Sequence, residues 1–147
     1  MKTSWRTISI VLGLAWAASL ALPVATFGDD QGEHWYGWAV LLLGWLGFFL
    51  GEFAWIANFT FAAALILLVR GRPPLVWGMM VGVLTSMLAA HALTWTQIFQ
   101  TGGGVAPVLA YWSGYYLWVP ATFAGGIALC VASLREVRAP AASTPAT

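Results

Sequence analysis

Apolar residues fill four stretches of the chain, and the longest runs from Trp35 to Val69. It is interrupted by one acid, Glu52, and one amide, Asn58. A helix that crosses a bilayer needs about 20 apolar residues. This stretch is therefore too long for one straight span and too short for two comfortable ones, and its arrangement decides the topology of the whole chain.

The other three stretches are each about long enough to cross a bilayer, and they predict spans over residues 7–27, 75–93 and 108–134. The first stretch follows a basic start and contains Ser19-Leu20-Ala21, which also fits a cleaved signal peptide. Because the run stays apolar past that point, we favour a retained helix over a cleaved one.

Polar segments separate the apolar stretches. We expect loops over 28–34 and 94–107, and the cluster Arg70 to Pro74 ends the long stretch because proline cannot continue a helix. The tail over 135–147 is rich in Ala, Pro, Ser and Thr and is predicted to be disordered. Residues 1–134 then form a single membrane domain.

The composition fits a chain that is surrounded by lipid. Hydrophobic residues make up 61% of it and charged residues 7%, against about 25% charged residues in soluble domains. The expected partner is the lipid bilayer, and a net charge of +1 without a basic patch argues against nucleic acid. The single cysteine, Cys130, excludes a disulfide within one chain.

All six cations fall at three places, which are Lys2 and Arg6, Arg70 and Arg72, and Arg135 and Arg138. Cytoplasmic flanks of membrane helices are enriched in Lys and Arg. One net crossing by the long stretch gives four crossings and puts every cation, and both termini, on the cytoplasmic side. Two crossings, with a turn at Gly51 and Glu52, would give five spans and divide the cations between the two sides.

The charge pattern favours four crossings and leaves five as the alternative. We therefore expect a span over 53–69, preceded by a re-entrant or interfacial segment over 36–51. The predicted fold is all-α: a polytopic transmembrane helix bundle of about four crossings. A bacterial inner membrane is the expected location.

Small residues recur at every fourth position in three places, namely Ser9, Gly13, Ala17 and Ala21; Gly78, Gly82, Ser86 and Ala90; and Gly47 and Gly51. This spacing puts them on one helix face, where they let another backbone approach closely. We interpret them as packing positions within the bundle. A docking face for a partner helix or for a second copy of the chain is the alternative.

Ten tryptophans are many for this length, and amphipathic rings concentrate at the headgroup level of membranes. The aromatic residues expected near the outer face are Trp35, Trp38, Trp95, Trp112 and Trp118, with Tyr36, Tyr111, Tyr115 and Tyr116.

Three polar residues within or beside the apolar stretches are the candidates for function: Glu52, Asn58 and His91. Glu52 is interpreted as a cap of exposed helix amides, with a proton relay or a cation site as alternatives. A buried amide such as Asn58 usually satisfies a neighbouring backbone or helix. His91 and His34 could ligate haem if both faced one cavity, but they do not form a metal motif, and no cofactor is predicted.

Two stretches carry a resemblance to a known kind of protein. Gly44-Trp45-Leu46-Gly47 followed by Ala54-Trp55-Ile56-Ala57-Asn58, and later Gly114-Tyr115-Tyr116-Leu117-Trp118, resemble the core of a family of small bacterial inner-membrane proteins without assigned function. In that family a proline often follows the asparagine, where this chain has Phe59. The resemblance implies a bacterial inner membrane and no activity, site or cofactor.

Motifs of zinc proteases, of serine hydrolases and of phosphate loops do not occur in the sequence. The leading hypothesis is therefore a non-enzymatic accessory or scaffolding subunit of a membrane assembly. The first alternative is a transporter or channel component that uses Glu52, Asn58 and His91. The second is a haem- or pigment-binding redox subunit that uses His34 or His91.

Overall fold

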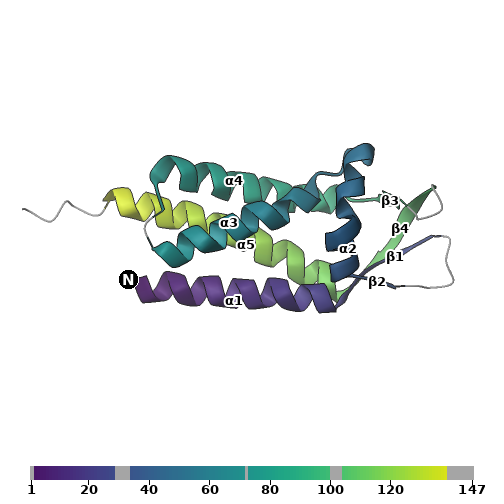
Figure 1. Cartoon of the computed structure of the whole chain (residues 1–147), viewed down its shortest axis with the longest axis horizontal. Helices are drawn as coiled ribbons and strands as arrows, with labels where there is room; N and C mark the ends of the chain where they lie inside the picture. The colour runs from purple at the N-terminus through teal and green to yellow at the C-terminus, as the bar shows by residue number, and fades with distance from the viewer. Residues whose placement is uncertain (1, 29–33, 72, 100–103, 139–147) are drawn as a thin grey trace, which may run out of the picture.

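Four long helices run antiparallel in an elongated bundle (Figure 1), and they are α1 (Lys2–Ala21), α3 (Ala57–Arg70), α4 (Leu75–His91) and α5 (Ser113–Arg138). The computed structural model describes residues 2–28, 34–71, 73–99 and 104–138. The start of α1, the turn from α3 to α4 and the end of α5 share one end of the bundle (Figure 1). The prediction of a mostly helical fold is confirmed.

The opposite end of the bundle is closed by short elements. Helix α2 (Gly37–Leu43) crosses this end (Figure 1) and continues as the 3₁₀ helix η1 (Gly44–Leu50). We call residues 37–50 the roof segment. The 3₁₀ helices η2 (Ala54–Ile56) and η3 (Ala92–Thr94) precede α3 and follow α4.

A four-stranded antiparallel sheet lies at the roof end, so the prediction of a purely all-α fold is wrong. Its strands, in the order β2-β1-β4-β3, are β1 (Pro23–Phe27), β2 (His34–Tyr36), β3 (Gln97–Phe99) and β4 (Val105–Tyr111). Strand β1 pairs with β4, with Ala25 opposite Tyr111. This pairing joins the segment after α1 to the segment between α4 and α5.

The sheet replaces the ends of two expected spans. Helix α1 stops before Pro23, and β1 takes up the rest of the first apolar stretch. Strand β4 occupies 105–111, so the last helix starts at Ser113 rather than at residue 108. Helix α5 extends to Arg138, past the expected start of the tail, and 139–147 lie outside the described residues.

Two helices end at a glycine in the left-handed conformation. Gly51 closes η1 with φ of 78°, and Gly71 closes α3 with φ of 74°. At the first, the amide of Glu52 donates to the carbonyl of Gly47 at 2.9 Å and that of Gly51 donates to Phe48 at 3.2 Å. This pair of bonds is a Schellman motif, and it ends the roof segment in a defined turn.

Helices α4 and α5 pack closely along a stripe of small residues. Gly78, Gly82 and Ser86 are buried on α4. A Cβ added at Gly82 would lie 2.7 Å from the carbonyl oxygen of Gly126 on α5. The stripe is therefore occupied within the chain, where small residues allow backbone-to-backbone contact.

The bundle has two separate buried clusters. One lies beneath the sheet and contains Val24, Phe27 and Tyr115. The other lies toward the opposite end and contains Ala64, Leu68 and Leu129. Between the described helices the buried side chains are mostly small, and they include the polar residues Ser9, Ser19, Thr85, Ser86, Thr122 and Ser133.

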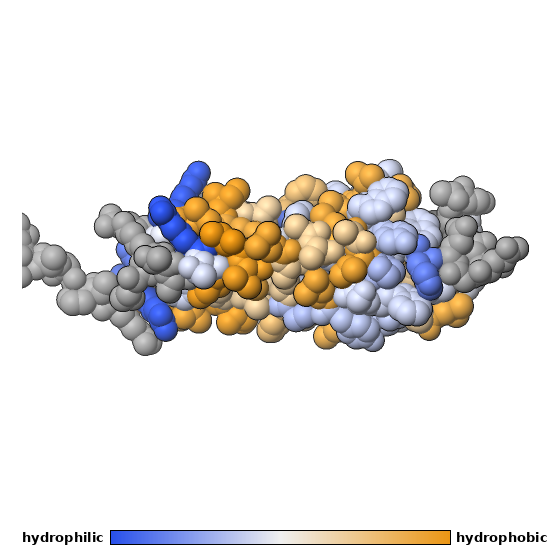
Figure 2. Space-filling view, turned by 90° about the horizontal axis from the view of Figure 1, so that it is seen from below, coloured by the Kyte–Doolittle hydropathy of each residue, from blue (hydrophilic) through white to orange (hydrophobic). Residues whose placement is uncertain are grey.

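Large apolar side chains cover the outside of the bundle instead. Exposed positions occur on every long helix, for example Leu14, Ile66, Met80 and Ile127. In Figure 2 the strongly hydrophilic residues gather mainly at the end where α1 begins, and an apolar zone follows. By length and composition, the helices over Leu75–Thr94 and Ser113–Glu136 could each cross a membrane, whereas three other apolar helices are shorter.

Substitution of Gly82 by alanine tests the close contact of α4 with α5. We expect it to lower the stability of the purified protein by about 1–3 kcal/mol, because the added methyl group overpacks the contact. Thermal unfolding in detergent measures the change. Gly13→Ala is the matched control, because a Cβ there would meet only Leu65, at an ordinary distance of 3.5 Å. Equal effects of the two substitutions would contradict the contact.

Candidate functional site

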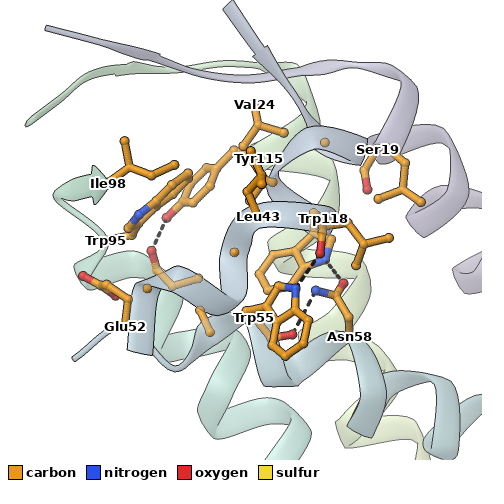
Figure 3. Close-up of a pocket in the computed structure, with 18 of the residues that line it drawn as sticks. Ser19, Val24, Leu43, Glu52, Trp55, Asn58, Trp95, Ile98, Tyr115 and Trp118 are labelled. Atoms are coloured by element: carbon orange, nitrogen blue, oxygen red, sulfur yellow. Dashed lines mark hydrogen bonds between the residues drawn. The ribbon is translucent and has the colours of Figure 1, made fainter. Parts of the chain in front are cut away.

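A cavity of about 100 Å³ lies under the roof segment at the sheet end of the bundle. Its walls come from the ends of α1, α3 and α5, from the roof segment, from η2 and η3, and from the sheet (Figure 3). Most of the lining is apolar, and aromatic rings contribute much of it: Trp55, Trp95, Tyr115 and Trp118. The polar side chains that also line it are Ser19, Glu52, Asn58 and Gln97.

Asn58 is the most highly connected polar group beside the cavity. Its Oδ1 accepts hydrogen bonds from Nε1 of Trp16 and from Nε1 of Trp118, both at 2.9 Å. Its Nδ2 donates to the carbonyl of Trp55 at 3.0 Å. Two indole donors can only face an oxygen, which fixes the orientation of the amide. One carboxamide in the first turn of α3 thus ties α1 and α5 to the start of that helix.

Trp55 connects this cluster to the roof segment. Its Nε1 donates to the carbonyl of Leu41 on α2 at 2.6 Å (Figure 3). A Cβ added at Gly44 would collide with the Trp55 ring, so the backbone of the roof segment lies directly against the indole. The roof is held to the bundle by Trp55 from below and by the turn at Gly51 at its end.

Glu52 follows that turn, and its carboxyl group lies near the end of α4. Oε2 is buried, makes no hydrogen bond and lies 3.6 Å from Nε2 of His91. Burial raises the pKa of Glu52 above its ordinary value, and the nearby His91 and the backbone amide of Thr96 only partly offset this. The neutral form of Glu52 is therefore favoured more in the folded protein than in the unfolded chain.

The interpretation of Glu52 as a helix cap is wrong. No side-chain hydrogen bond caps η2 or α3, the two helices that start after it. The carboxyl group instead lies beside His91, and the backbone of Thr96, which precedes β3, favours its charged form and so lowers its pKa. Glu52 therefore brings the end of the roof segment next to the end of α4.

His91 is held by groups that define its hydrogen-bonding pattern. Thr94 donates its hydroxyl proton to the carbonyl of His91 at 2.7 Å, so the hydroxyl can only accept from Nδ1, 3.2 Å away. Nε2 faces two oxygens, which are the Gly51 carbonyl at 3.3 Å and Glu52 Oε2 at 3.6 Å. Of these two oxygens, only the Gly51 carbonyl lies within hydrogen-bond distance of Nε2.

The two histidines have different surroundings. Nδ1 of His34 lies 3.0 Å from Oγ1 of Thr26, and its ring packs on Trp112 with centroids 4.7 Å apart. His91 contacts Glu52 and stacks on Phe53 instead. Neither histidine lines the cavity, and among the described residues no three His, Cys, Asp or Glu side chains are placed to hold a metal ion.

The remaining predicted packing positions have varied surroundings. Gly13 is half-buried against α3, whereas Ala17 is exposed on α1. Gly47 lines the cavity, and a Cβ there would lie 3.1 Å from Cβ of Glu52. Gly51 has open space around it. Only the α4 stripe forms a continuous helix contact.

Sequence reasoning missed the roles of several aromatic residues. Trp16 was not singled out, and Trp118 and Tyr115 were assigned to the headgroup level. Tyr115 is buried and donates to the carbonyl of Ala92 at 3.0 Å. Other members of the expected outer group, such as Trp38 and Trp112, are exposed. A regular spacing in the sequence does not reveal which rings turn inward.

Comparison of the chain with protein-family models, with curated proteins and with solved structures found no match in any of the three.

Replacement of Asn58 by alanine tests the hydrogen-bonded cluster. It leaves the indole donors of Trp16 and Trp118 without a partner, and each partly buried unpaired donor costs about 1–3 kcal/mol. We therefore expect a loss of about 2 kcal/mol or more in thermal or denaturant unfolding. Thr60→Val is the control on the same helix, because Thr60 bonds only to the local Ala57 carbonyl. A loss no larger than that of the control would contradict the role of Asn58.

The pH dependence of stability tests the environment of Glu52. Because its folded pKa is raised above the ordinary value of 4.5, the group contributes stability below that pH, and this stability is lost as the pH rises through the folded pKa. The charged or titratable groups that face it are His91 from α4 and Tyr111 from β4. We expect the unfolding temperature to fall as the pH rises from the ordinary pKa of Glu52 through its raised folded pKa.

Glu52→Gln should flatten this part of the pH profile, because glutamine mimics the neutral acid. His91→Gln removes the imidazole beside Glu52 and serves as a second comparison variant. A Glu52→Gln profile as steep as that of the natural protein would contradict the assignment.

Proposed function

We propose that the chain is an integral protein of a bacterial inner membrane that crosses the bilayer four times, with both termini in the cytoplasm. The observation that carries this proposal is the distribution of charge. Five cations lie at one end of the bundle, and they are Lys2, Arg6, Arg70, Arg135 and Arg138. Arg72 lies outside the described residues, one position after Gly71. Lys and Arg concentrate on the cytoplasmic side of membrane proteins.

The surface of the bundle supports a lipid environment. Large apolar side chains are exposed along the long helices, while Ser and Thr are buried between them. Water-soluble proteins bury their large apolar residues and rarely expose extended apolar patches. In lipid no such pressure exists, and small residues with a few polar ones hold the helices together.

Helix α3 is the weakest of the four proposed spans. Its 14 residues extend about 21 Å, and a hydrocarbon core is about 30 Å thick. With η2 the helical segment covers 17 residues, or about 26 Å. The roof segment lies over this short end and exposes Trp38, Trp45, Phe48 and Phe49. These rings fit an interfacial segment at the headgroup level, as proposed for residues 36–51.

The role that we propose is non-enzymatic: an accessory or scaffolding subunit of a membrane assembly. Its support is the use of the polar side chains for structure, above all the Asn58 cluster. The α4 stripe packs against α5, so a partner helix or second copy would have to use another face. The resemblance to small bacterial inner-membrane proteins fits this proposal.

A transporter or channel component is the second candidate, and one observation favours it. Glu52 lines the cavity and lies beside His91, so a proton could move between the two groups. Loss of flux in Glu52→Gln at a normal protein level would support transport, whereas loss of the protein itself would support a structural role. For the redox alternative, an absorption spectrum of the purified protein without haem or pigment bands would remove it.

Reporter fusions test the topology directly. A fusion after Arg72 and another after Arg138 are expected to report a cytoplasmic location, because positive residues stay on that side. A reporter inserted in the segment 28–34 or 100–104 is expected to report the outer side. An external reporter after Arg72 would contradict four crossings and favour five. Comparable protein levels of all fusions, measured by immunoblot, are the control.

A further inference from the structure

We propose that the cavity under the roof segment binds a hydrophobic organic cation, meaning an ammonium group that carries an apolar moiety. The proposal does not rest on the membrane topology, because it concerns the chemistry of the cavity lining.

The size of the cavity suits a small organic molecule. Its volume is about 100 Å³, and a buried water needs about 10–15 Å³ by the same kind of measure. The space therefore corresponds to roughly seven to ten water molecules. The lining is mostly apolar, which disfavours a cluster of waters as the occupant and favours a ligand with about ten heavy atoms.

The charge of the lining selects the sign of the ligand. Glu52 supplies the only carboxyl group among the residues that line the cavity, and no Lys or Arg lines it. Its Oε2 is buried and makes no hydrogen bond, and Nε2 of His91 lies 3.6 Å away. The ionised form of this carboxyl group would attract an ammonium group and repel an anion.

The aromatic walls favour the same sign. The faces of Trp and Tyr rings carry partial negative charge and attract cations, above all quaternary ammonium groups. Four such rings line this cavity, from Trp55, Trp95, Tyr115 and Trp118.

The polar atoms of these four rings are already used. Trp55 donates to Leu41, Trp95 to Gln97, Tyr115 to Ala92 and Trp118 to Asn58. The rings are therefore fixed in place. Their N–H and O–H donors are all engaged, so none of them is available to a carboxylate or carbonyl group of a ligand. The side-chain amides of Asn58 and Gln97 are neutral, so no lining group offers a full positive charge.

A pair of isosteric probes tests the proposal on the purified full-length chain in a maltoside detergent at mildly alkaline pH. Benzyltrimethylammonium carries the positive charge, and neopentylbenzene has the same shape with carbon in place of nitrogen. Quenching or shift of tryptophan fluorescence measures both affinities. Because cation–π attraction and the carboxylate act only on the charged probe, we expect it to bind at least roughly tenfold more tightly. The anion 3-phenylpropanoate should not bind.

Three variants distinguish binding in the cavity from partition of the probe into the detergent micelle. Ala54→Leu fills the cavity and should abolish saturable binding of the cation; what remains is partition into the micelle. Glu52→Gln should lower the affinity for the cation roughly tenfold and leave the affinity for the neutral probe unchanged. Glu136→Gln makes the same chemical change at the other end of the bundle and should have no effect.

Several results would overturn the proposal. These are equal affinities for the two isosteres, an equal effect of Glu52→Gln on both, or binding of the cation that survives Ala54→Leu. If Glu52→Gln does not fold, the comparison of the two isosteres on the natural chain and the Ala54→Leu variant still test the proposal. A failed topology experiment with intact cation selectivity would contradict the proposed membrane arrangement alone.

Discussion

The carboxamide of Asn58 is the contact on which the roof end of the structure depends. A polar group that is withdrawn from water must find its hydrogen bonds inside the protein. Asn58 accepts from two indoles on different helices and donates to the backbone at the start of a third. The carbonyl of Trp55 accepts that bond, and the indole of Trp55 in turn donates to the carbonyl of Leu41 in the roof segment. One side chain therefore sets the relative positions of α1, α3 and α5 and, indirectly, of the roof.

The cavity is a consequence of how these fixed rings meet. The indoles that satisfy their N–H groups on Asn58 and on backbone carbonyls cannot turn to fill the space between them. The sheet closes the same end by joining the segments after α1 and after α4. The small-residue contact of α4 with α5 carries the remaining length of the bundle. Glu52 lies at the edge of this assembly, paired with His91 and incompletely satisfied.

The sequence predicted the helices well because long apolar stretches bounded by charges and prolines leave few other structures. The break at Gly51 was also visible, since a glycine next to an acid interrupts an apolar run that is too long for one helix. The sheet was missed because β1 and β4 are apolar extensions of helical stretches, and hydropathy alone does not distinguish them. Pro23 was the available signal for the end of α1. The pairing of Asn58 with Trp16 and Trp118, and of Glu52 with His91, depends on contacts distant in sequence that spacing does not encode.

Hydrogen exchange of the tryptophan indole protons, followed by NMR with the protein in lipid nanodiscs, tests the central role of Asn58 most directly. The Nε1 protons of Trp16 and Trp118 are both donated to the same oxygen. They should exchange at least roughly tenfold more slowly than that of Trp45, which is 48% exposed on the roof segment. Exchange of Trp16 and Trp118 as fast as that of Trp45 would contradict the account.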